Sequence, residues 1–225
     1  MVDEFSKFER QIQTAITWVR THQERFWSVT GTAVIVIVLF IFALHRHQEE
    51  NAQAWTQLGV VQGQLIQGKY DDAKKSVDQW EQRFKSSSAS GYERFLKADL
   101  LYKTSDYAQA AQVYGSLSES APNQEMKPLA LSAQESAEEM AGHLPQALAA
   151  AEALIDKYPD HFLTARAYMA KARIAEMQGN IPMAISTYDR FLMLYPQHPS
   201  AAIAKARRQA IGGSAAPVAN TAPIH

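Results

Sequence analysis

The histidine, aspartate and glutamate side chains are the groups in this sequence that could hold a metal ion. The seven histidines form no H-E-x-x-H pattern. His45 and His47 flank Arg46, and a zinc site would need a third donor beside them, so we interpret the pair as polar residues at the edge of an apolar segment. The sequence therefore predicts no metal site.

Adjacent carboxylates such as Glu138-Glu139 and Asp71-Asp72 could support acid–base chemistry, but in helical segments such pairs are typically solvated residues or caps. The chain has no cysteine, no glycine-rich phosphate loop and no G-x-S-x-G pattern. Its 22 basic and 23 acidic side chains leave no positive excess for nucleic acid. We expect no catalytic residue, no cofactor, no small-molecule substrate and no nucleic-acid partner.

An internal repeat of 37 residues organises most of the remaining chain. Alanine recurs at this spacing. Each alanine comes five residues after a glycine or serine, and in three units a proline comes twelve residues after the alanine. The alanines are Ala73, Ala110, Ala147 and Ala184, the preceding residues Gly68, Ser105, Gly142 and Gly179, and the prolines Pro122, Pro159 and Pro196. A fixed period of this length is typical of stacked helical repeats. Such arrays present extended surfaces to other proteins.

Each unit contains two helical segments separated by the glycine or serine. Asn180, Asp106 and Asp71 are candidate N-caps of the second segments, and the prolines are expected to end them. The pattern resembles the tetratricopeptide repeat (TPR) over about residues 52–198, with three residues added to that motif's period of about 34. Position 7 of the motif, normally aliphatic, is Lys97, Gln134 and Lys171 in the later units.

The resemblance implies an all-α fold, with about four helical hairpins followed by a capping helix that begins after Pro199 and ends at Gly212-Gly213. It also implies a concave face lined by the first helix of each hairpin. Carried over, the partner-binding residues are Trp55, Tyr92, Phe95, Asp99, Tyr102, Lys103, Arg166, Met169, Arg173, Glu176 and Met177. Apolar members of this face, notably Leu58, Leu65 and Phe95, could equally be packed core.

Residues 26–44 form an uncharged apolar segment that precedes the repeats. As a helix it would be about 28 Å long, close to the hydrocarbon thickness of about 30 Å. A buried core helix and a cleaved signal peptide are the alternatives. The length favours a transmembrane helix over a core helix, and the absence of small residues before a cleavage point disfavours a signal peptide. We predict a single-pass anchor in contact with lipid, and expect its helix to continue into the first repeat.

The basic residues predict the topology. Lys7, Arg10, Arg20 and Arg25 precede the apolar segment, and only Arg46 closely follows it, which places the N-terminus in the cytoplasm. We therefore expect residues 1–25 to be a cytoplasmic amphipathic segment, or a helix that simply leads into the anchor. Residues 45–211 would be a periplasmic solenoid and 212–225 a disordered tail.

This arrangement resembles the ancillary SecYEG translocon subunit (YfgM-like) family of inner-membrane TPR proteins. The resemblance implies an adaptor in the bacterial inner membrane that links exported polypeptides to periplasmic chaperones near the Sec translocon. A scaffold subunit of a stable inner-membrane complex is the alternative. An outer-membrane lipoprotein is disfavoured because the chain has no lipobox cysteine.

Overall fold

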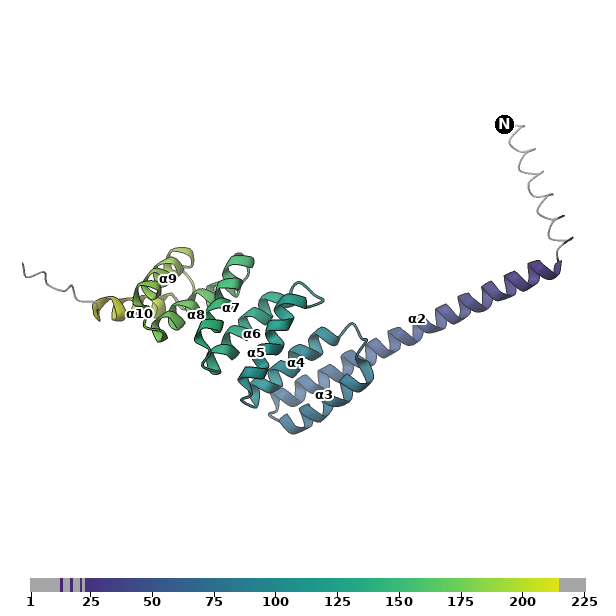
Figure 1. Cartoon of the computed structure of the whole chain (residues 1–225), viewed down its shortest axis with the longest axis horizontal. Helices are drawn as coiled ribbons and strands as arrows, with labels where there is room; N and C mark the ends of the chain where they lie inside the picture. Colours follow the sequence, from purple (N-terminus) through teal and green to yellow (C-terminus); the bar gives the residue numbers. More distant parts are fainter. Residues whose placement is uncertain (1–12, 14–16, 18–20, 22, 215–225) are drawn as a thin grey trace, which may run out of the picture. The chain divides into compact units, whose positions relative to one another are not determined.

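The computed structural model describes residues 13, 17, 21 and 23–214, and within them it forms nine helices and no strand (Figure 1). The helices are α2 (Gln23–Ile66), α3 (Tyr70–Phe84), α4 (Ser90–Lys103), α5 (Tyr107–Ser120), α6 (Met126–Met140), α7 (Leu144–Lys157), α8 (Thr164–Met177), α9 (Ile181–Leu194) and α10 (Ala201–Ser214). The predicted all-α solenoid is confirmed. Most of the predicted amphipathic segment 1–25 and residues 215–225 of the predicted tail lie outside the described residues.

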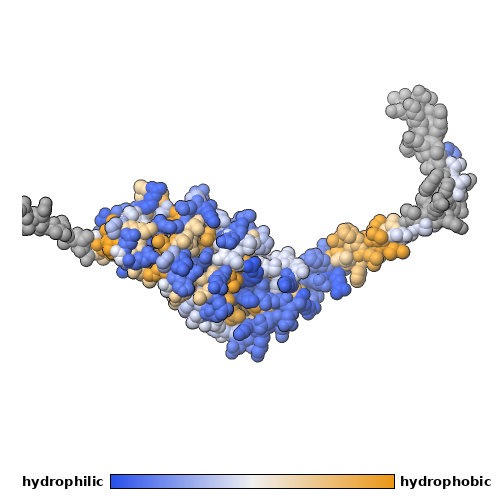
Figure 2. All heavy atoms as spheres, in the orientation of Figure 1, coloured by the Kyte–Doolittle hydropathy of each residue, from blue (hydrophilic) through white to orange (hydrophobic). Residues whose placement is uncertain are grey.

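Helix α2 runs without a break through the predicted anchor and into the first repeat unit, as expected from its composition. Within Thr30–Ile66 it carries a window with a mean hydropathy of 1.7, none of which is buried, and this window is the large apolar surface in Figure 2. By length and composition the segment could cross a membrane. The chain divides into two compact units, Met1–Gln53 and Ala54–His225, and the boundary falls inside α2.

The turns inside the hairpins share one backbone conformation. Gly68, Gly142 and Gly179 have φ values of 72°, 80° and 73°, and Ser105 stands at the equivalent position with φ 66°. After each of them the next backbone N–H donates to the carbonyl five residues earlier, as from Asn180 N to Ala175 O at 2.8 Å. This pattern is the Schellman motif, which satisfies carbonyls at the helix end and needs a left-handed residue. The recurring glycine is therefore explained by the turn.

The second helices begin with side-chain caps in two of four hairpins. Asp106 accepts a hydrogen bond from Gln109 N, and Asn180 accepts one from Met183 N, so both predicted caps are confirmed. The predicted cap at Asp71 is wrong, because Lys69 occupies the cap position of α3 and contributes no side-chain bond. Asp71 instead lies in the first turn of α3, where a carboxylate is favoured by the positive end of the helix dipole.

The prolines end the second helices as predicted. Helices α5, α7 and α9 each stop two residues before Pro122, Pro159 and Pro196. Proline lacks the N–H that the next helical turn would use, and it pushes the preceding residue out of the helical region.

The repeated alanines and the large residues after them build the core. Ala73, Ala110, Ala147 and Ala184 are all fully buried. Seven residues after each alanine, the side chain packs between consecutive hairpins, and each such burial contributes about 1.5–3 kcal/mol. These side chains are Trp80, Leu117, Leu154 and Phe191, all at most 1% exposed. The indole N–H of Trp80 also donates to Ala54 O at 2.9 Å, which fastens α3 to α2.

Helix α10 caps the array, but it is longer than predicted. Ala204 is fully buried against Tyr188 and Phe191 of α9, as a capping helix requires. The predicted end at Gly212-Gly213 is wrong, since α10 continues through both glycines to Ser214. Gly212 does not adopt the positive φ of a terminating residue, and a helical glycine costs only about 1 kcal/mol relative to alanine.

Candidate functional site

The candidate site is the surface made by the last turns of α2 and by α4, α6, α8 and α10, here called the first-helix face. One row on this face shows the 37-residue period in its side chains, all of which are exposed: Trp55, Tyr92, Leu129, Arg166 and Ile203. Leu129 and Ile203 are not among the predicted residues. The repeat register, extended into the third unit and into the cap, would have found them. The row offers one large side chain per helix along the length of the array.

The row begins with an aromatic pair. The rings of Trp55 and Tyr92 meet edge to face with centroids 4.9 Å apart, and the residues are 44% and 42% exposed. Edge-to-face contact holds both rings in place while their remaining surface stays open. This end of the face can contact apolar or aromatic side chains of another chain.

Beneath the row, the apolar candidates belong to the core. Leu58 and Leu65 are buried at 4% and 9% exposure and pack in the first hairpin. Phe95 is half-buried and stacks edge to face on Tyr114 at 5.2 Å. These residues pack beneath the face. Leu58 and Leu65, for which groove and core were equal alternatives in the sequence, belong to the core.

A buried carboxylate lies at the centre of the face. Glu135 on α6 has a side chain only 3% exposed, and its Oε2 lies 3.7 Å from Arg166 Nη2 while its Oε1 lies 3.5 Å from Arg173 Nη2. The Nε of Arg173 also donates to Glu139 Oε1 at 2.9 Å. Two predicted residues, Arg166 and Arg173, therefore converge on a glutamate that the sequence reasoning did not select.

Hydroxyl groups complete this centre. The Nη2 of Arg166 donates to Ser136 Oγ at 2.6 Å, and its Nη1 donates to Ser132 Oγ. Both guanidinium groups stay about half exposed, with side chains 51% and 45% accessible. They are held in fixed positions by α6 and still face solvent. This geometry can bind a carboxylate or a backbone carbonyl of another chain.

The electrostatics of the centre follow from its burial. Desolvation raises the pKa of Glu135, the Arg166 charge opposes this rise, and the neighbouring Glu139 adds to it. Desolvation also raises the pKa of Tyr102 on α4, whose hydroxyl feels the charges of Arg166, Glu135 and Glu139. Tyr102 therefore lies close enough to this centre for its pKa to respond to the charges there.

Two further carboxylates on the face are fixed by tyrosines from behind. The Tyr114 hydroxyl donates to Asp99 Oδ1, and the Tyr188 hydroxyl donates to Glu176 Oε1 at 2.5 Å. Burial raises the pKa of Tyr188 to about 12, so this hydroxyl stays a donor. Arg207 of the capping helix lies 3.5 Å from Glu176 Oε2. The predicted residues Asp99 and Glu176 thus tie the second helices to the face.

The remaining predicted residues differ in exposure. Lys103 and Met177 are exposed at the ends of α4 and α8. Met169 is half-buried against the cluster around Tyr188 and Phe191, so it contributes more to packing than to the face. The structure brings Arg166 and Arg173 together at Glu135, and leaves the Trp55–Tyr92 pair as a separate feature of the same face.

The unusual polar residues at motif position 7 lie on another side of the first helices. Lys97 Nζ pairs with Glu81 Oε1 at 2.6 Å, and Lys171 Nζ pairs with Glu152 Oε1 at 2.7 Å. Gln134 lies close to Gly115 of α5, because a Cβ atom added at Gly115 would be 3.0 Å from Gln134 Nε2. In all three units the side chain at motif position 7 extends to the second helix of the preceding hairpin. This contact explains why the residue differs from the aliphatic one of the motif.

No cluster of three or more histidine, aspartate or glutamate side chains suited to a metal ion occurs in the described part of the chain. Several charged groups of the first-helix face are instead paired across helices, as at Arg166, Arg173 and Glu176. Such an arrangement suits recognition of another protein by fixed ion pairs and exposed aromatics.

Comparison with known proteins finds a family match over part of the chain and a similar fold over most of it. The tetratricopeptide repeat family pattern matches residues 137–210. No curated protein sequence matches. A crystal structure of nearly identical TPR-like repeats from Podosopora anserina is 11% identical, with a TM-score of 0.60 over 73% of this chain and 89% of that one. MamA (residue 41 to its end) from Desulfovibrio magneticus RS-1 is 17% identical, with a TM-score of 0.55 over 72% and 89%.

These likenesses concern the fold, and together with the family match they support a TPR protein. A TPR fold supports an adaptor or scaffold role through contacts with other proteins.

Proposed function

We propose that this chain is a membrane-anchored TPR adaptor that binds extended segments of other proteins along its first-helix face. The observation that carries the proposal is the arginine pair at the centre of that face. Arg166 and Arg173 are fixed by the buried Glu135 and remain about half exposed. Side chains fixed before binding lose less conformational entropy on binding, so they favour affinity.

The partner expected for this face is an extended or helical segment with both apolar and acidic groups. The exposed row offers Trp55, Tyr92, Leu129 and Ile203 to apolar side chains, and the arginine pair offers donors to carboxylates or carbonyls. Spacing by whole repeat units suits a chain that crosses several helices in turn. Polypeptides emerging unfolded from a membrane channel have this character.

The apolar window of α2 and the basic residues before it suggest where the adaptor acts. We place the N-terminus in the cytoplasm, the window in a bacterial inner membrane and the repeats in the periplasm. Tethering would raise the effective concentration of the repeats for proteins at the same membrane. The resemblance to ancillary translocon subunits favours a position near the Sec translocon, where the adaptor would link exported clients to chaperones.

Site-specific photo-crosslinking in cells tests this function. A photoreactive residue at Tyr92, Tyr102 or Arg173 should capture exported polypeptides, a chaperone or translocon subunits, identified by mass spectrometry. Gln79 of α3 and Arg190 of α9 are exposed on second helices and serve as control positions. Capture of lipid alone, or the same proteins at equal yield from the control positions, would refute the assignment of the face.

A scaffold subunit of a stable inner-membrane complex is the second candidate, because small residues in α2 would let another helix approach closely. A side chain at Gly31 would meet no atom within 4 Å, and Thr32 keeps its hydroxyl bonded to Ser28 O at 2.8 Å. Replacing the transmembrane segment with an unrelated one separates the two candidates. An adaptor should still crosslink its clients after the exchange, whereas a scaffold should fail to assemble with its complex.

A further inference from the structure

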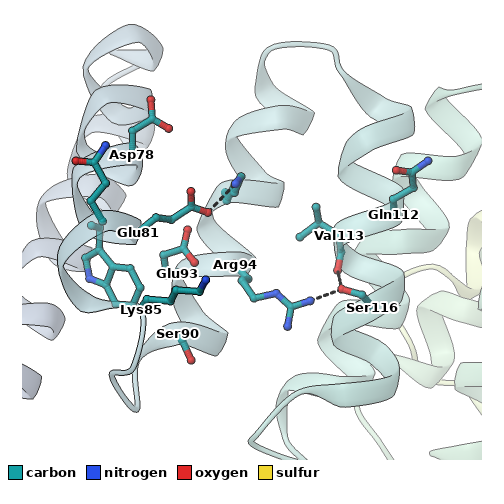
Figure 3. Close-up of a pocket in the computed structure, with 12 residues that line it drawn as sticks. Asp78, Glu81, Lys85, Ser90, Glu93, Arg94, Gln112, Val113 and Ser116 are labelled. Carbon is teal, nitrogen blue, oxygen red and sulfur yellow. Dashed lines mark hydrogen bonds and ion pairs between the residues drawn. The ribbon is translucent and has the colours of Figure 1, made fainter.

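Two equivalent grooves lie between consecutive second helices. The first runs between α3 and α5 with α4 as its floor and has a volume of about 850 Å³ (Figure 3). The second runs between α5 and α7 over α6 and has a volume of about 290 Å³. Eight of the twelve residues that line the first groove have a register counterpart that lines the second, so the fold repeats much of the depression.

The two grooves differ in chemistry at matched positions. Glu93, Arg94 and Lys97 line the first groove. Leu131 and Gln134, the register counterparts of Arg94 and Lys97, line the second groove, whereas Ala130, the counterpart of Glu93, is fully buried in α6 and does not line it. The second groove shows that the stacked fold does not require charges at these positions. Lys97 and Arg94 bond to Glu81 of α3 and Ser116 of α5, so packing between helices accounts for them, and Glu93 is the member of the set that is left to explain.

Glu93 is the most constrained member of that set. The residue is 3% exposed, and its Oε1 has no hydrogen-bond partner among the residues that the structure describes. Burial, and then the charge of Glu81 beside it, raise the pKa of Glu93 to about 7. A buried oxygen without a donor is costly, typically about 1–3 kcal/mol, unless a bound group supplies the donor.

The cations that line the groove do not supply this donor. Lys97 Nζ is directed to Glu81 Oε1 at 2.6 Å, and Arg94 extends across the groove to Ser116 Oγ on α5 (Figure 3). Lys85 and Asp78 also line the groove, without a described bond to Glu93. Glu93 and Glu81 thus lie side by side, with Lys97 bonded to Glu81, and an additional cation would be attracted to both carboxylates.

We propose that this groove is a second binding site, which takes a lysine or arginine side chain of a partner polypeptide with its cationic group donating to Glu93 Oε1. The volume lies within the range typical of ligand pockets, so it accommodates a long side chain together with the backbone on either side of it. The site is on another side of α4 from Tyr92 and Asp99, and it does not depend on the function proposed for the first-helix face.

Fluorine NMR of the full chain in detergent micelles tests this site. The chain has four tryptophans, so 5-fluorotryptophan labelling gives four signals that Trp→Phe variants assign. Trp80 lines the groove and Trp55 lies on the first-helix face, so the two surfaces report separately. The probes are the capped tripeptide Gly-Arg-Gly and its isosteric, uncharged counterpart Gly-citrulline-Gly.

The arginine peptide should shift the Trp80 signal saturably, should leave Trp55 unchanged, and should bind about tenfold more tightly than the citrulline peptide, as loss of one charge-assisted bond implies. Glu93→Gln should abolish this preference while leaving the ligand-free Trp80 signal in place. Glu152→Gln, which removes a carboxylate from another second helix, should leave the preference intact. Equal binding of both peptides, no saturable Trp80 shift, or an unchanged preference in Glu93→Gln would overturn the proposal.

Discussion

Glu135 and Ala172 occupy the same position in consecutive repeat units, and both are buried, although one carries a charge. Ala172, like Ala98 in the second unit, allows two helices to pack closely. Glu135 instead extends between α6 and α8 and meets Arg173, the residue next to Ala172. The position at which alanine allows close helix packing in other units is therefore occupied in the third unit by Glu135, which fixes the charged centre of the first-helix face.

A double-mutant cycle on Glu135→Gln and Arg173→Ala measures this coupling. Because the carboxylate is buried and the guanidinium half exposed, we expect a coupling free energy of about 1 kcal/mol. Urea unfolding of the full chain in mild detergent, followed by circular dichroism, provides the measurement. Additive effects of the two substitutions would mean that the pair contributes nothing specific.

Overpacking one repeated alanine tests the hairpin geometry. Ala184 is fully buried between α8 and α9, so Ala184→Leu should lower the free energy of unfolding by about 1–3 kcal/mol. Ala108 is exposed in α5, and Ala108→Leu is the matched control, expected within about 0.5 kcal/mol of the unsubstituted protein. An unchanged melting temperature for Ala184→Leu would contradict the close approach of the two helices.

The turn between α4 and α5 offers a stabilising substitution. Ser105 has φ 66°, in a region that glycine adopts without steric cost. Ser105→Gly should therefore raise the free energy of unfolding by about 0.5–1 kcal/mol, and the reciprocal Gly179→Ala should lower it by about 1 kcal/mol. Thermal unfolding of both variants checks the signs. A loss of stability in Ser105→Gly would show that the serine side chain contributes more than its backbone strain costs.

The buried Glu93 should make stability depend on pH. Its pKa is raised from 4.5 in the ordinary state to about 7 in the fold. A raised carboxyl pKa means that the folded state holds the proton more tightly, so the stabilisation is complete below about pH 4.5 and is lost as the pH rises through about 7.

The comparison that isolates this effect is with Glu93→Gln, which does not titrate. The unfolding free energy of the unsubstituted protein, relative to this variant, should fall by about 1–3 kcal/mol between pH 4.5 and 8. Glu152→Gln is the control and should run parallel to the unsubstituted protein. A constant difference between the unsubstituted protein and Glu93→Gln across this range would show that Glu93 titrates normally.

The sequence predicted the hairpins well because each signal is local and has one physical cause. A glycine at a left-handed turn and a proline beyond a helix end act on their own neighbours, as at Gly179 and Pro196. The wrong predictions are also local. Asp71 lies near the start of α3 but does not cap it, and Gly212 and Gly213 do not end α10.

The charged centre could not be predicted in the same way. The ion pair between Glu135 and Arg173 joins residues 38 apart on two helices, and no periodic pattern of charged residues in the sequence indicates it. The available signal was the register itself, which aligns Glu135 with alanines and Glu93 with Ala130 and Ala167. At Glu135 the charged residue in the alanine position is met by Arg166 and Arg173 of α8.

The left-handed residue between the two helices of every hairpin also bears on how the chain acquires its structure. Each turn is determined by its own residues, and each partner helix follows within one repeat length. Folding therefore needs few contacts between residues distant in sequence, which favours a high folding rate. The array can then grow hairpin by hairpin as the polypeptide is synthesised, with only the newest edge left uncovered at any moment.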